Sequence, residues 1–486
     1  MSKKILIIII FAFLLRLIDI TFPISGWHSW RQADTAAMAR NFYSSGHSIV
    51  YPQIDWRGNT EGFVESEFPL YQYLISLFYR IFGVEEIIGR LLSVFASLCI
   101  IFGLYLIVKK ILGEKTALTA SLIYSVLPLN IYFNRAFMPE TVMMTFSVWG
   151  IYFFIRWIDD DKITYFIISF IFISLAALLK LPSLYLGLPL AYLSFKKYGV
   201  KTFYNYKILF FTVIVFLIVA LWYYHSHQLY LLTGLTFGIW TPGTNKWLMF
   251  DMLLKPSFYN DLIFKSIAER HLTYAGFIIF IWGLFIKRTK EKEFMFDFWL
   301  IAIIIFFLIV PEGNLSQEYY QLPFNIVASV FISKVIVKYY NIYVNRKSKL
   351  LSSTNRTALV IILICLTLLP VLSAHRLYNF YKQENKNSAI FELSEKIQSV
   401  SDKSDLIITV SEGNPVFLYN ANRKGWVCNM QDVNKNYLNE KKSKGAKYLL
   451  ADKTFLKDKI NPGSFAEVIK IFKTVSDNDK FIILEL

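Results

Sequence analysis

The chain has 486 residues, of which 55% are hydrophobic, 17% are aromatic and only 18% are charged. Apolar runs of about 20 residues, long enough to cross a bilayer, recur along most of the sequence and exclude an ordinary soluble protein. The formal net charge of +16 does not indicate a nucleic-acid partner, because Lys and Arg lie between the apolar runs rather than on one basic face.

Hydropathy predicts a polytopic all-α membrane protein with about eleven spans. The first run follows two lysines as in a secretory signal, but no small-residue cleavage site comes after it, so we expect a retained helix. The predicted spans cover residues 5–24, 85–108, 115–133, 139–157, 163–180, 182–196, 206–224, 271–286, 295–310, 321–338 and 357–374.

Lys and Arg set the predicted orientation in the cell (plasma or inner) membrane. The outer segments 134–138 and 311–320 carry one basic residue between them, Arg135. By the positive-inside rule, the N-terminus is cytoplasmic, the number of spans is odd and the C-terminal part is extracytoplasmic. The basic clusters expected inside are Lys109–Lys110, Arg156 with Lys162, 196–207, 287–292 and 346–356.

Two of the predicted outer loops are unusually long, residues 25–84 and 225–270. In the first, residues 33–44 and 69–82 have apolar side chains at helical spacing but are too short to span. Their aromatic and Arg content favours helices that lie in the membrane interface.

The composition changes near the C-terminal end, where charged residues mix with short apolar runs. Residues 388–400 have a helical pattern, and residues 405–410, 446–451 and 481–486 are typical of strands. Alternating helices and strands indicate a small α/β fold. We therefore predict a transmembrane domain over residues 1–375 and a soluble, extracytoplasmic α/β domain over residues 376–486.

Asp34 is the first candidate for chemistry. It follows Trp30 and Arg31 just beyond the first span, at the start of a predicted interfacial helix. A carboxylate in that position either interacts favourably with the helix dipole or accepts a proton in a reaction, and both interpretations stay open.

Other polar residues follow the same pattern at predicted outer ends of helices. Glu67 precedes Pro69, and Glu140 follows Pro139, so each carboxylate either caps its helix or acts in catalysis. Arg135, Lys180 and Arg270 are cations that can hold a phosphate. Because the topology places all of these residues on one face, we also expect substrate contacts there from Trp30, Arg31, His271, Glu318, Tyr319 and Tyr320.

Several other chemistries lack a sequence signal. No Cys, His, Asp or Glu spacing of a structural metal site and no Gly-rich phosphate loop is present. The inner loops are too short to form a nucleotide-binding domain. No cofactor is firmly indicated, and a divalent metal stays possible.

The order of these motifs resembles the GT-C glycosyltransferases, and most of all their family 39 branch of protein O-mannosyltransferases and lipid A aminoarabinose transferases. The resemblance covers about residues 1–375 and rests on a long first outer loop with an early Asp and two interfacial helices, followed by an acidic turn. The segments that carry it are WRQADTA, ESEFPLYQYL, RAFMPET and QEYYQLP.

The resemblance implies transfer of a sugar from a polyprenyl-phosphate carrier to a lipid, glycan or protein acceptor on the outer face, with inversion. Asp34 matches the first-loop acidic residue and would be the general base or its organiser. Glu67 and Glu140 match the two further acidic positions, although Phe68 replaces the family's basic residue. Lys180 matches a basic residue at the end of the fifth span.

Two other classes of protein compete with this interpretation. A transporter or lipid flippase would place ionisable residues within its spans and often shows two related halves, whereas here they cluster at one face. A receptor or assembly scaffold would leave the carboxylates of the first loop unexplained.

Overall fold

The computed structural model describes residues 2–238, 247–345, 352–384, 388–453 and 462–486. The chain forms two compact units: unit 1 comprises residues 1–20, 91–222 and 242–379, and unit 2 comprises residues 21–90, 223–241 and 380–486. Parts of two predicted features lie outside the described residues: residues 346–351 of the last basic cluster and residues 239–246 of the second long loop.

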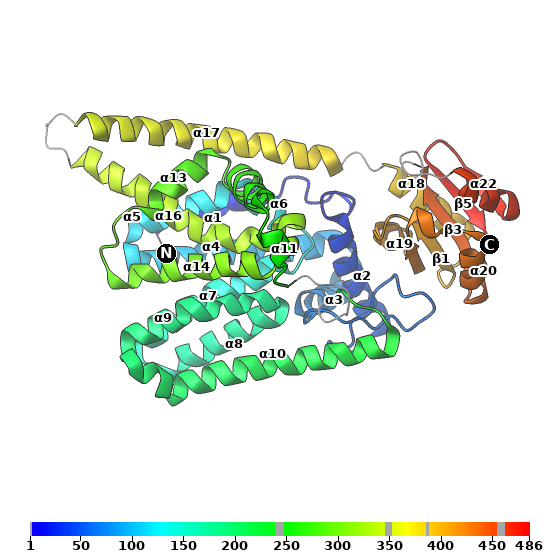
Figure 1. The fold of residues 1–486 in the computed structure, drawn as a ribbon, viewed down its shortest axis with the longest axis horizontal. Helices are drawn as coiled ribbons and strands as arrows, with labels where there is room; N and C mark the ends of the chain where they lie inside the picture. Colours follow the sequence, from blue (N-terminus) through cyan, green and yellow to red (C-terminus); the bar gives the residue numbers. More distant parts are fainter. Residues whose placement is uncertain (1, 239–246, 346–351, 385–387, 454–461) are drawn as a thin grey trace. The chain divides into compact units, whose positions relative to one another are not determined.

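Unit 1 is helical (Figure 1). Three of the unit boundaries fall within long helices, α4, α10 and α17. Its helices are α1 (Lys3–Arg16), α4 (Glu86–Leu112), α5 (Glu114–Val126), α6 (Pro128–Phe133), α7 (Glu140–Asp160), α8 (Ile163–Leu179), α9 (Gly187–Tyr198), α10 (Tyr206–Thr233), α11 (Phe250–Leu253), α12 (Pro256–Tyr259), α13 (Ala275–Leu284), α14 (Phe294–Ile309), α15 (Pro311–Ser316), α16 (Leu322–Val344) and α17 (Ser353–Glu384), with the shorter or irregular turns η1 (Leu181–Leu186), η2 (Gly199–Tyr204), η3 (Asn260–His271), η4 (Glu291–Glu293) and η5 (Glu318–Gln321).

The helices support the predicted membrane class. Within the described residues, 5 helices are long and apolar enough to cross a membrane: α4, α7, α10, the continuous η5–α16 and α17. Every predicted span overlaps helical structure, although α1 ends at Arg16 within the span 5–24, and the number eleven stays a prediction. The span over residues 115–133 is broken before Pro128, because the residue before a proline is biased toward an extended conformation. Leu127, with ψ 133°, thus separates α5 from α6.

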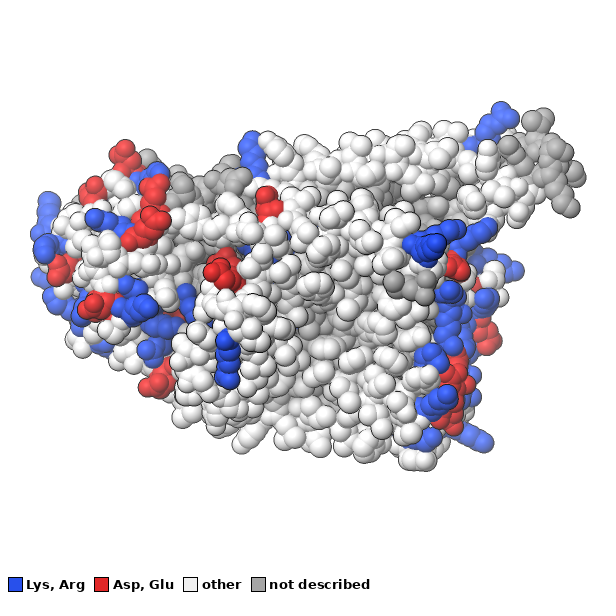
Figure 2. All heavy atoms as spheres, turned by 180° about the vertical axis from the view of Figure 1, so that it is seen from behind, with Lys and Arg blue, Asp and Glu red and all other residues white. Residues whose placement is uncertain are grey.

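The predicted inner loops of unit 1 lie beside one another and form what we call the basic face. Lys110 and Lys292, from different loops, both pair with Asp159 at the end of α7. Lys196 pairs with Glu291 at 3.3 Å. Figure 2 shows Lys and Arg gathered at this end, beside a broad uncharged surface. The grouping of these loops agrees with the positive-inside pattern, while the orientation itself stays a prediction.

The other end of α7 carries the predicted outer residues of unit 1. A helix of 21 residues is about 31 Å long, so Glu140 lies far from the basic face. There α7 contacts η1, while η3 contacts α6 and α15, and α15 contacts η5. Segments far apart in the sequence therefore bring their polar residues to one end of unit 1.

Unit 2 begins with two packed helices of the first long loop, α2 (Ser29–Ser45) and α3 (Leu70–Phe82). Pro69 precedes α3 as the sequence predicts. The expected start of α2 at residue 33 is wrong, because the helix already begins at Ser29. Asp34 consequently lies within α2 rather than at its start, and it is only 3% exposed.

The rest of unit 2 is a small α/β fold around a five-stranded sheet of order β2-β1-β3-β5-β4. β1 pairs parallel with β2 and β3, and β5 pairs antiparallel with β3 and β4. The three predicted strands and the predicted helix are confirmed, whereas β2 and β4 are additional. The elements are α18 (Ser388–Val400), β1 (Leu406–Val410), α19 (Val416–Ala421), β2 (Lys424–Cys428), η6 (Met430–Asp432), α20 (Lys435–Ser443), β3 (Ala446–Asp452), α22 (Pro462–Ile471), β4 (Lys473–Asp477) and β5 (Phe481–Glu485).

The sheet has its own hydrophobic core. Alternate side chains of its central strands, such as Ile408, Leu449 and Ile482, are almost fully buried and pack together. A strand whose two faces are both covered by helices carries apolar residues along most of its length, as β1 and β5 do. Burial of these side chains is the main force that holds the sheet together.

Candidate active site

Several of the predicted site residues form two groups, one in each unit. Asp34 is the centre of the group in unit 2. The indole Nε1 of Trp56 donates a hydrogen bond to Asp34 Oδ1 at 2.8 Å. Burial raises the pKa of Asp34 to about 7, although the Trp56 hydrogen bond and the nearby Arg31 cation both favour its ionised form. Asp34 is therefore a carboxylate that exchanges a proton near neutral pH.

Arg31 and Glu67 lie in the same group and form an ion pair of 2.5 Å. Arg31 is one helical turn before Asp34, and Glu67 comes from the segment just before α3. Both side chains are largely buried, at 9% and 21% exposure. Glu67 thus fixes the Arg31 guanidinium beside Asp34. Trp30 lies half-buried on the same helix.

Phe237 covers this group from a third segment. Its ring centre is 5.8 Å from the Arg31 guanidinium carbon and 5.9 Å from the Trp56 ring. The backbone of Phe237 is held by an N–H bond to the carbonyl of Glu65 at 3.1 Å. The fully buried Glu65 carboxylate also accepts a hydrogen bond from Thr236. These contacts close one apolar side of the Asp34 group.

Lys180 and Glu140 are the centre of the group in unit 1. Lys180 Nζ donates to Glu140 Oε1 at 2.7 Å, and both side chains are at least 95% buried. Glu140 begins α7 and Lys180 follows the last residue of α8. Each charge therefore has the sign that its helix end favours.

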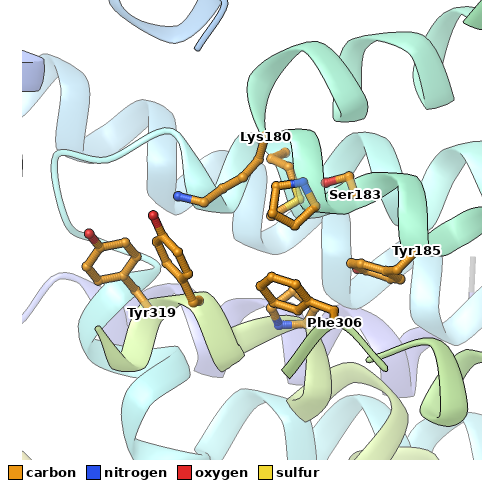
Figure 3. Close-up of a pocket in the computed structure, with 9 residues that line it drawn as sticks. Lys180, Ser183, Tyr185, Phe306 and Tyr319 are labelled. Atoms are coloured by element: carbon orange, nitrogen blue, oxygen red, sulfur yellow. The ribbon is translucent and has the colours of Figure 1, made fainter. Parts of the chain in front are cut away.

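The two predicted tyrosines lie against the same lysine. Lys180 Nζ is 4.2 Å from the ring centre of Tyr320 and 5.3 Å from that of Tyr319. Figure 3 shows Lys180 pointing toward Tyr319. These residues border a small cavity with a volume of about 10 Å³, which Ser183 and Tyr185 also line. This space holds about one water molecule. The geometry joins Lys180, Glu140, Tyr319 and Tyr320 into one cluster.

The remaining predicted residues of unit 1 make separate contacts. Arg135 is 2% exposed and donates to the carbonyl of Asp19 at 3.1 Å. Arg270 pairs with Glu318. His271 is fully buried, and its Nδ1 lies 3.0 Å from the side-chain oxygen of Asn325. Arg270, Glu318 and His271 therefore meet at the junction of η3 with η5 and α16.

Sequence reasoning missed Trp56 as a site residue. The available signal was an aromatic residue within a polar loop, in the run Asp55-Trp56-Arg57-Gly58. That signal is weak, because nothing local indicates that the indole reaches a carboxylate 22 positions earlier. Within the described parts of the chain, no three His, Cys, Asp or Glu side chains come together in a way that would hold a metal ion.

Comparisons with known proteins agree with this architecture. A family model described as dolichyl-phosphate-mannose-protein mannosyltransferase matches residues 66–225, which is less than half of the chain. No curated protein sequence matches the chain.

Three solved structures have a similar fold at low sequence identity. ArnT from Cupriavidus metallidurans bound to undecaprenyl phosphate has a TM-score of 0.64 and 11% identity over 100% of this chain and 98% of its own. Its apo state has a TM-score of 0.60 and 12% identity over 99% and 97%. The archaeal oligosaccharyltransferase AglB from Archaeoglobus fulgidus, in complex with an inhibitory peptide and a dolichol-phosphate, has a TM-score of 0.58 and 13% identity over 93% and 69%. The chain therefore has the GT-C glycosyltransferase fold, which confirms the resemblance seen in its sequence at the level of the fold.

Proposed function

We propose that the chain is a membrane glycosyltransferase that moves a hexosyl or pentosyl group from a polyprenyl-phosphate carrier to an acceptor hydroxyl at the outer face of the cell membrane. The acceptor oxygen attacks the anomeric carbon, the bond from that carbon to the phosphate oxygen breaks, and polyprenyl phosphate leaves. A single displacement inverts the anomeric configuration. The acceptor's proton passes to Asp34.

The observation that carries this proposal is the environment of Asp34. A general base works best when its pKa lies near the operating pH, and burial raises the pKa of Asp34 to about 7. The Trp56 hydrogen bond occupies Oδ1 and thereby fixes the direction of the carboxylate. Arg31 beside it stabilises the ionised form that must accept the proton.

The phosphate of the carrier needs cations. Lys180, Arg135 and Arg270 are the candidates, and Lys180 borders a cavity. Lys180 and Arg270 each already pair with a carboxylate, Glu140 and Glu318. We assign to Glu140 and Glu67 the task of holding their cations in place, rather than a direct proton transfer. ArnT bound to undecaprenyl phosphate and AglB in complex with a dolichol-phosphate are similar in fold, which supports a carrier of this class.

The experiment that tests the proposal is the substitution Asp34→Asn. Asn keeps an oxygen that accepts the Trp56 hydrogen bond but removes the base, so we expect transfer to fall about 10²–10⁴-fold. Purified full-length protein is mixed with undecaprenyl-phosphate-linked hexoses or pentoses and native-host membranes as the acceptor source, and release of undecaprenyl phosphate is measured. Binding of undecaprenyl phosphate alone is expected to persist.

Two results would contradict the proposal. Near-normal transfer by the Asp34→Asn protein would remove Asp34 as the base. Movement of the lipid-linked sugar across vesicles without any release of undecaprenyl phosphate would favour a flippase instead.

A further inference from the structure

One edge of the C-terminal sheet, formed by β2, is covered by a short segment of the first loop. β2 is the outermost strand on its side of the sheet. The N–H of Gly58 donates to the carbonyl of Gly425 at 2.7 Å, and the N–H of Gly425 donates to the carbonyl of Asp55 at 3.1 Å. Residues 55–58 thus satisfy backbone groups that an open edge would expose. This attachment lies entirely within unit 2.

The side chain of Asp55 adds a buried ionic contact to the same attachment. Its carboxylate is 1% exposed and pairs with Lys424 of β2 and, at 2.5 Å, with Arg40 of α2. Asn41 donates at 3.1 Å to Oδ1, the oxygen that also pairs with Lys424, whereas Arg40 pairs with Oδ2. Burial opposes the charge of Asp55, but Lys424 and Arg40 together outweigh it and lower the pKa to about 2. Asp55 therefore stays ionised at neutral pH and ties β2 to α2.

Gly58 shows how close this packing is. It has φ +59°, and a Cβ built there would lie 2.7 Å from Nε1 of Trp426. Both the backbone conformation and the lack of space therefore require glycine. Any larger residue would force the segment or the Trp426 side chain on β2 to shift.

Trp56 lies between the two anchored residues, Asp55 and Gly58. The position of its indole, which donates to Asp34, is consequently set by the attachment to β2. We propose that the C-terminal sheet is a positioning element of the active site: Lys424 and Gly425 fix the segment 55–58, and Trp56 in turn holds the Asp34 carboxylate. This inference rests on the proposed role of Asp34 as the base.

Loosening the attachment has a predictable chemical consequence. The indole hydrogen bond favours the ionised form of Asp34, so its loss raises the pH at which the base becomes active. The charged groups that face Asp34 are Arg31 on its own helix and Asp55 from the loop. Removing Lys424 takes away a cation that pairs with Asp55, so the Asp55 charge, which opposes ionisation of Asp34, is less compensated and the profile shifts the same way. Gly58→Ala changes no charge and so isolates the positional effect.

The test compares pH profiles of full-length variants, read as release of undecaprenyl phosphate from an undecaprenyl-phosphate-linked sugar. Lys424→Met and Gly58→Ala are expected to raise the apparent pKa by about one unit, which corresponds to one lost hydrogen bond. Lys424→Arg keeps the cation and should restore most of the wild-type profile. Lys480→Met is the matched control, because Lys480 pairs with Glu392 in the sheet domain, outside this attachment.

Trp56→Phe provides a variant that leaves the attachment intact. It retains the backbone bonds to β2 and removes only the indole donor, so it should show the same shift even if the other variants fold poorly. Faster hydrogen exchange at the Gly58 amide in Lys424→Met would show the loosening directly. One outcome is that Asp34→Asn abolishes transfer while Lys424→Met, Gly58→Ala and Trp56→Phe keep the wild-type pH profile. In that case the proposed positioning role of the sheet is wrong, whereas the assignment of Asp34 as the base stands. If Asp34→Asn transfers normally, the proposed function itself fails.

Discussion

At the scale of single residues, burial gives Asp34 its properties. An exposed carboxylate is ionised at neutral pH and is a weak base, whereas a carboxylate withdrawn from water holds its proton more tightly. The sequence identified Asp34 from its place beyond the first span. It could not show the burial or the Trp56 donor, because both depend on segments that are distant in the chain.

The raised pKa of Asp34 predicts a pH-dependent stability. The folded-state pKa of Asp34, about 7, exceeds its ordinary value of 3.8. The contribution of Asp34 to the free energy of unfolding is therefore fully present below about pH 4 and is lost as the pH rises through 7. Asp34→Asn avoids this loss, so above pH 7 it should be more stable than wild type by up to ~4 kcal/mol. Thermal unfolding in detergent from pH 4 to 8 measures the difference. Asp479→Asn, at an exposed position, is the control. A stability difference between Asp34→Asn and wild type that is the same at every pH would contradict the prediction.

For the ion pair of Lys180 with Glu140, we predict that a double variant regains stability without regaining lipid binding. Lys180→Met removes the lysine cation from the buried Glu140 carboxylate and should cost about 3–5 kcal/mol. Adding Glu140→Gln should recover most of that stability, yet binding of undecaprenyl phosphate should stay at least tenfold weaker.

A matched pair on the basic face provides the control. Lys334 and Glu293 are similarly buried and 3.0 Å apart, so Lys334→Met should destabilise the protein without weakening lipid binding after correction for folded protein. Full recovery of lipid binding in the Lys180→Met, Glu140→Gln protein would reduce Lys180 to a structural role.

At the scale of elements, hydrophobic periodicity predicted the long helices and three of the strands. It missed β2 and β4, because KGWVC contains a glycine and KTVSD is mostly polar, so neither has the apolar alternation of a strand. Helix ends were less accurate. The start of α2 at Ser29 has no capping side chain, and the preceding His28 adopts a left-handed conformation with φ 51°, which no local sequence signal indicates.

At the scale of the whole molecule, the sequence predicted the membrane class and the GT-C fold, since both depend on repeated apolar runs and on the order of motifs. It treated residues 376–486 as a separate domain. That division stays a prediction, although within unit 2 the sheet and the first loop share hydrogen bonds and ion pairs. A boundary drawn from composition cannot reveal contacts between residues 55–58 and β2.

The orientation leads to a topology prediction. Because the basic loops of unit 1 gather at one end, we expect that end in the cytoplasm and the C-terminal part outside. A reporter that is active only outside the cytoplasm should be active when fused after Leu486 and inactive when inserted at Thr289. The reverse pattern would overturn the orientation and move the proposed reaction to the inner face.

The central claim is that Asp34 accepts the acceptor's proton, and the pH profile of transfer tests it most directly. With undecaprenyl-phosphate-linked sugar and native-host membranes, wild-type kcat/KM should rise about tenfold per pH unit below 7 and level off above it, because only ionised Asp34 accepts a proton. The Asp34→Asn protein should lack this rise, and its kcat/KM should stay low from pH 5 to 8. A wild-type rate that is flat between pH 5 and 8, or an unchanged rising limb in Asp34→Asn, would contradict the account.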